Sequence, residues 1–187
     1  AWPPLSDTVF ISNNGVDVWI TAVGLTVLGL VLQAVNLAVT VWKLRAPGMA
    51  WRRLPPFSFS AAVSSWVLIV AGTVMLAALV MLEIDRHFSG VFFDAGEGGA
   101  PLYYQHLSWI FFTGCYLLFL LPAIGAISEI LPTFSGKPLL ARGAVSGSIA
   151  AIGALGLLAW MENMYTASIP IGWLYGSMAA ALLLAVP

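Results

Sequence analysis

The sequence predicts an all-α membrane protein in which a bundle of helices crosses a lipid bilayer. Of the 187 residues, 60% are hydrophobic and only 8% are charged, whereas a soluble domain carries about 25% charged residues. Five long apolar stretches divide the chain, and about 20 apolar residues are enough to cross a bilayer as a helix. A surface that faces lipid needs no charge, so a bilayer accounts for the shortage of polar residues.

These stretches define five predicted spans in one bundle without an internal repeat. They cover about 18–42, 57–82, 107–130, 144–161 and 171–187. The fifth is short for a full crossing, and the first residues contain neither an initiator Met nor the basic region of a signal peptide. Both ends look cut, so we expect residues 1–187 to be a single transmembrane bundle segment of a longer chain.

Charges in the short loops predict the orientation of the spans. Two loops are basic: Lys43, Arg45, Arg52 and Arg53 follow the first span, and Lys137 and Arg142 follow the third. By the positive-inside rule, both loops face the cytoplasm or the mitochondrial matrix. The loop from Glu83 to His106 then lies outside, where Asp85, Asp94 and Glu97 stand against the single Arg86.

Polar and small residues within two spans predict helix packing. Gln33, Asn36 and Thr40 share one face of the first span, where we expect hydrogen bonds between helices. The fourth span is rich in small residues, and its Gly143 and Gly147 are spaced for close approach of two backbones. We therefore expect the fourth span to be buried among other helices.

Few side chains offer ligands or catalytic groups. A net charge of −1 leaves no basic patch for phosphates, which excludes nucleic acid as a partner. Cys115 lies in an apolar span, where a thiol is usually inert packing. His87 and His106 lie in or next to the outer loop, so neither suits a haem inside the bundle. Glu83 and Glu129 are at span ends, where we expect them to be solvated.

Several short motifs occur along the chain. In chain order they are NLAVTVWKLRAPGM (36–49), DRHFSGVFF (85–93), YQHLSW (104–109), LPAIGAIS (121–128), TFSGKP (133–138), WMENMYTA (160–167) and a terminal AVP. Together they resemble subunit I of the haem-copper oxidases, the membrane core of cytochrome c oxidase. Their order and spacing are similar to the family's fourth to eighth helices. The resemblance implies part of a haem-copper oxidase subunit I-like bundle in the bacterial cytoplasmic or mitochondrial inner membrane. Its partners would be lipid, other helices of subunit I and other subunits of a respiratory complex.

The chain departs from this family where the family binds copper. The family motif HPEVY, whose His is a copper ligand, corresponds to TGCYL here, so Thr113 stands in place of that His. Two further ligands belong to the motif WxHHMYT, where this chain has Glu162 and Asn163. Copper in such a site needs imidazole or sulfur ligands. We therefore expect no copper in this segment, although a hard cation on these oxygen groups stays open.

Two other family residues of the sixth helix are also replaced. Leu117 stands in place of the Tyr that is covalently joined to a copper ligand, and Cys115 in place of the Glu that delivers protons. Tyr116 lies about 100° around the helix from Leu117, so we do not expect it to substitute. Glu162 and Asn163 are candidates for a functional site because of their depth, but a plain helix end reaching water is the favoured interpretation.

The resemblance leads to one main interpretation and two alternatives. The main one is a subunit I homologue in a respiratory electron-transfer complex, from an oxidoreductase family but without catalysis at this segment. Any haem would then be ligated outside the segment. The first alternative is a divergent, active terminal cytochrome c oxidase subunit I. The second is an ion-conducting or transport module that reuses the bundle, although no span carries a charge at its centre.

Overall fold

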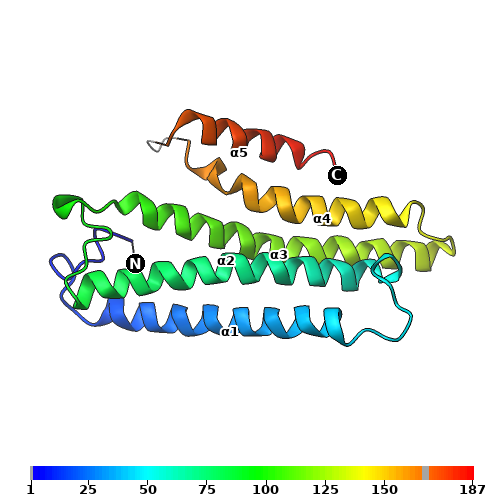
Figure 1. The fold of residues 1–187 in the computed structure, drawn as a ribbon, viewed down its shortest axis with the longest axis horizontal. Coiled ribbons are helices and arrows are strands. Elements are labelled where there is room, and N and C mark those ends of the chain that lie inside the picture. Colours follow the sequence, from blue (N-terminus) through cyan, green and yellow to red (C-terminus); the bar gives the residue numbers. More distant parts are fainter. Residues whose placement is uncertain (1, 166–168) are drawn as a thin grey trace.

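The computed structural model describes residues 2–165 and 169–187, and these residues form an all-helical bundle (Figure 1). The five α-helices are α1 (Gly15–Lys43), α2 (Pro56–His87), α3 (Pro101–Ser135), α4 (Arg142–Leu158) and α5 (Ile171–Leu183). Short 3₁₀ turns lie at η1 (Trp51–Arg53), η2 (Ala95–Glu97) and η3 (Ala159–Asn163). All five predicted spans are helices. The first three, and α4 together with η3, are long and apolar enough to cross a membrane.

Helices α2 and α3 extend further toward the outer loop than predicted. α2 continues to His87, and α3 begins at Pro101, which is the first residue of the helix. Proline favours that position because its missing N–H would have no partner there. Glu, Arg and the other charged residues that end the apolar run of α2 are compatible with a helix. His106 therefore lies inside α3 rather than in a loop.

The connections between helices alternate between the two ends of the bundle. Figure 1 shows the α1–α2 and α3–α4 connections at one end and the α2–α3 connection at the other. Both basic loops thus lie at the same end, as a single orientation of the bundle requires. The side of the membrane that this end faces stays a prediction.

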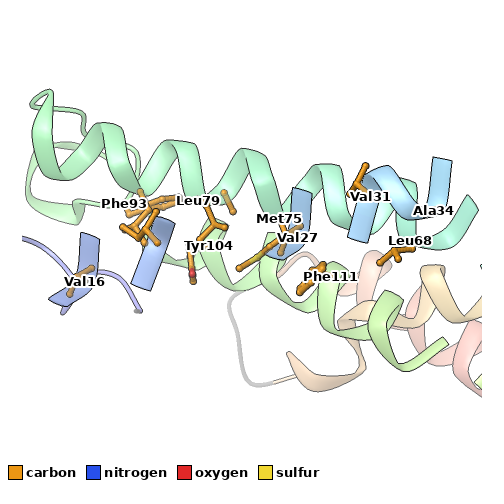
Figure 2. Close-up of a cluster of buried hydrophobic side chains, with 13 residues drawn as sticks. Val16, Val27, Val31, Ala34, Leu68, Met75, Leu79, Phe93, Tyr104 and Phe111 are labelled. Atoms are coloured by element: carbon orange, nitrogen blue, oxygen red, sulfur yellow. The ribbon is translucent and has the colours of Figure 1, made fainter. Parts of the chain in front are cut away.

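The core lies where α2 packs against α1, α3 and α4. Figure 2 shows side chains of three helices in the larger cluster, among them Val27 of α1, Met75 of α2 and Phe111 of α3. Glycine lets α2 and α3 approach closely, because a Cβ on Gly114 would overlap the methyl group of Ala71. A second cluster joins α4 to the bundle: Val67, Leu117, Leu121 and Ile149.

Gly143 and Gly147 of the fourth span do not contact the described helices, because a Cβ on either would meet no described atom within 4 Å. Burial of this span among other helices of a longer chain stays a prediction. The face that α4 buries contains Ile149, Gly153 and Gly156. At about 100° per residue, Gly143 and Gly147 lie roughly 130° around the helix from that face. Among the residues that the structure describes, α4 contacts α2, α3 and α5, and Gly143 and Gly147 take no part in this packing.

Polar groups near the helices also differ from the predictions. Thr40 Oγ1 donates to the Asn36 carbonyl oxygen at 2.8 Å, a bond within α1 rather than between helices. Glu129, predicted to be solvated, accepts a hydrogen bond from the Phe57 backbone N–H at 2.7 Å. That N–H lies in the first turn of α2 and has no partner within its helix. Glu129 is therefore a cap contributed by α3. The side chain of Glu83, also predicted to be solvated, is 39% exposed, but one of its carboxylate oxygens is buried and has no hydrogen-bond partner among the described residues.

Candidate functional site

The three positions that the motifs predict to replace the family's copper ligands meet in one pocket between α3 and η3. The pocket has a volume of about 330 Å³, and its walls are Trp109, Phe112, Thr113, Tyr116, Glu162 and Asn163. The four residues of α3 are spaced for one face of a helix. The tight turn of η3 continues α4 and carries Glu162 and Asn163 against that face. Both η3 side chains are exposed, so the pocket is open.

Aromatic rings form most of the α3 wall. The ring centroids of Trp109 and Phe112 are 5.9 Å apart, with an interplanar angle of 67°. Beside the pocket, the ring of His106 packs edge-on against Trp160 at 5.0 Å. His106 Nδ1 is buried and has no hydrogen-bond partner among the described residues. Sequence reasoning missed this aromatic wall, although the spacing of positions 109, 112, 113 and 116 was a signal for it.

Tyr116, not Leu117, lines this pocket, and the expectation that it does not substitute for the family's Tyr stays a prediction. Leu117 is only 2% exposed and contacts Gly156 in the second core cluster. Tyr116 is 68% exposed and lines the pocket with Thr113. Around the helix axis, Tyr116 lies about 100° from Leu117 but only about 60° from Thr113. A phenol therefore lies beside Thr113 in this pocket.

Cys115 lies away from the pocket. Its side chain is partly buried and packs against the larger core cluster. This position agrees with the predicted packing role.

A second group of polar residues lies where the start of α1 packs against the end of α2. Asp17, Glu83 and His87 each offer one ligand atom, and these atoms lie within 4.8 Å of one another. Arg86, whose side chain is 1% exposed, already holds Asp17 through a 2.6 Å ion pair and donates to the Ser6 carbonyl oxygen. The guanidinium would repel a cation beside it. The group is therefore suited to joining the start of α1 to the end of α2.

Comparison with known proteins identifies the family. The whole chain, residues 1–187, matches the family described as Cytochrome C and Quinol oxidase polypeptide I. The bacterial relatives include cytochrome c oxidase subunit 1 of Cereibacter sphaeroides, which is 36% identical over 186 residues. This match covers 100% of the chain and 32% of the relative.

Other relatives agree in name and in coverage. Ubiquinol oxidase subunit 1 of Acetobacter aceti is 37% identical over 89% of the chain and 25% of the relative. Cytochrome c oxidase subunit 1 of Thermostichus vulcanus is 32% identical over 100% of the chain and 34% of the relative. The chain thus spans about a third or less of the length of these relatives. It is an integral membrane protein, and it belongs to the cytochrome c and quinol oxidase polypeptide I family, the haem-copper oxidase subunit I family that its motifs resemble.

Proposed function

We propose that this chain is part of a subunit I homologue that serves a respiratory electron-transfer complex without the family's active-site copper. Such a subunit does not reduce oxygen at this site. The observation that carries the proposal is the content of the pocket between α3 and η3. Its three replaced ligand positions supply one hydroxyl, one carboxylate and one amide, from Thr113, Glu162 and Asn163.

The chemistry of these groups supports the proposal. Copper sites in proteins are built from imidazole and sulfur ligands, whereas oxygen ligands suit harder ions. The single thiol of the segment, Cys115, packs in the core and lines no wall of the pocket. Tyr116 keeps a phenol in the pocket, so the difference from the family lies chiefly in the metal ligands.

Haem in the full-length parent would take its axial ligands from outside this segment. The ring of His87 lies 3.1 Å from the Asp17 carboxylate at the end of α2, where it is 45% exposed. His106 packs edge-on against Trp160. His87 is the last residue of α2 and His106 lies in the second turn of α3, so both rings lie near one end of the bundle, whereas a haem inside the bundle takes its axial ligand from within it.

Copper analysis of the full-length parent complex tests the proposal. The copper content should be unchanged when Thr113→Ala, Glu162→Ala and Asn163→Ala are combined, since any copper present would be bound elsewhere. Oxygen uptake, if the complex shows any, should also be unaffected. Loss of one copper ion per subunit I in this triple variant would overturn the proposal.

The converse experiment introduces copper ligands at the same three positions. Thr113→His, Glu162→His and Asn163→His together would give the pocket three imidazoles from two elements, the donor set that copper prefers. We expect this variant to bind one more Cu²⁺ per subunit than the unaltered protein, measured by elemental analysis after dialysis. Failure to gain copper in a folded variant would contradict the assignment of these positions to the former ligand set.

A further inference from the structure

Two hollows adjoin at the basic end of α1 and α2. One is an apolar groove of about 350 Å³ between the helices, with Val39 of α1 and Ile69 of α2 in its walls. The other, of about 480 Å³, is formed by the loop after α1 and includes Arg45. Trp42 and Lys43 line both hollows. The apolar groove therefore borders a hollow that contains basic side chains.

Tryptophan rings form the junction between the two hollows. The ring centroid of Trp42 lies 5.4 Å from that of Trp51 and 6.3 Å from that of Trp66. The Arg45 guanidinium lies over the Trp51 ring, 4.3 Å from its centroid, and donates to the Met49 carbonyl oxygen at 3.3 Å. Tryptophan is enriched at the headgroup level of membranes, and the cation–π contact holds the cation at that level.

The charged residues of the segment that forms the junction have one sign. The loop carries four basic residues, and no Asp or Glu occurs between residues 18 and 82. Within the described ranges, none of the four basic side chains forms a salt bridge. Anionic lipid headgroups are the usual partners of such basic clusters at the cytoplasmic surface.

We propose that this pair of hollows binds one anionic phospholipid of the inner leaflet. The phosphate lies between Lys43 and Arg45, and one acyl chain follows the groove between α1 and α2. From Val35 to Lys43 the groove follows α1 for about 12 Å. One leaflet has about 15 Å of hydrocarbon, so the groove covers most of the depth that an acyl chain occupies.

The test uses the full-length parent protein, delipidated in detergent and then titrated with phosphatidylglycerol or phosphatidylcholine. Native mass spectrometry counts the lipids retained. We expect one phosphatidylglycerol per subunit to bind most tightly, with phosphatidylcholine clearly weaker. Lys43→Gln with Arg45→Gln should weaken phosphatidylglycerol binding roughly thirtyfold, the loss expected for two cations near a membrane surface. Val39→Trp, which fills the groove without changing charge, should also weaken it.

The matched control is Lys137→Gln with Arg142→Gln, which removes the same charge from the other basic loop. This control should leave the tightest site intact. Equal loss in both charge variants would show only general surface attraction and would overturn the proposal. A photoreactive acyl chain should label the groove wall around Ile69. If a photoreactive side chain placed at Val39 captures another protein segment in the parent complex instead of lipid, the groove is a protein interface and the proposal fails.

Discussion

Gly114→Ala should loosen the contact between α2 and α3, the contact on which the larger core cluster depends. The added methyl group would overlap the methyl group of Ala71, which is 0% exposed. Overpacking of this kind costs about 1 to 3 kcal/mol, while the change from Gly to Ala favours a helix by about 1 kcal/mol. The net effect on the free energy of unfolding is therefore a loss of about 0 to 2 kcal/mol.

Gly29→Ala is the control, because a Cβ at Gly29 in α1 would meet no atom of the described residues within 4 Å. It should gain about 1 kcal/mol from helix propensity alone. The two Gly→Ala changes should thus differ by about 1 to 3 kcal/mol. The free energy of unfolding of both variants is measured by titrating the full-length protein with SDS in mixed micelles, with tryptophan fluorescence as the signal.

A compensating change isolates the steric contact. Ala71→Gly alone should destabilise the bundle by about 1 kcal/mol through helix propensity. Combined with Gly114→Ala, it makes room for the new methyl group, so the two changes should couple favourably by about 1 to 3 kcal/mol. Additive effects within about 0.5 kcal/mol would refute the close approach of the two helices.

Asp17→Asn should destabilise the protein more than Arg86→Met. The first change leaves the buried guanidinium of Arg86 without a counter-charge, whereas the second removes the guanidinium itself. Thermal unfolding that ranks the two variants in the opposite order would contradict this prediction. Replacing His87 and His106 together by Gln should leave the Soret band of any haem in the parent complex unchanged. A lost or shifted band would place an axial ligand in this segment. A single cysteine at Arg52, in a Cys-free background, should react with an impermeant maleimide only from the inner side of sealed vesicles, and labelling from outside would reverse the orientation.

Features that depend on local sequence were largely predictable. Insertion of a helix depends on the apolar length of its own segment, so the positions of the spans followed from residues such as those of 18–42 and 57–82. Errors came at the helix ends, where charged residues end the apolar run but not the helix. The family motifs are also local, and they located Thr113, Glu162 and Asn163 correctly as positions that come together.

Only the tertiary structure decided which side of each helix faces which neighbour. Hydropathy could not show that Leu117 is buried and Tyr116 faces the pocket, because lipid and a helix partner are equally apolar surroundings. Gly143 and Gly147 have suitable spacing for a helix contact, yet the rotation of α4 is set by Ile149 and its neighbours. The pairing of Asp17 with Arg86, 69 residues apart, likewise arises from packing. Rotation about the helix axis is determined by side-chain fit between helices, and that fit is not encoded in any one segment.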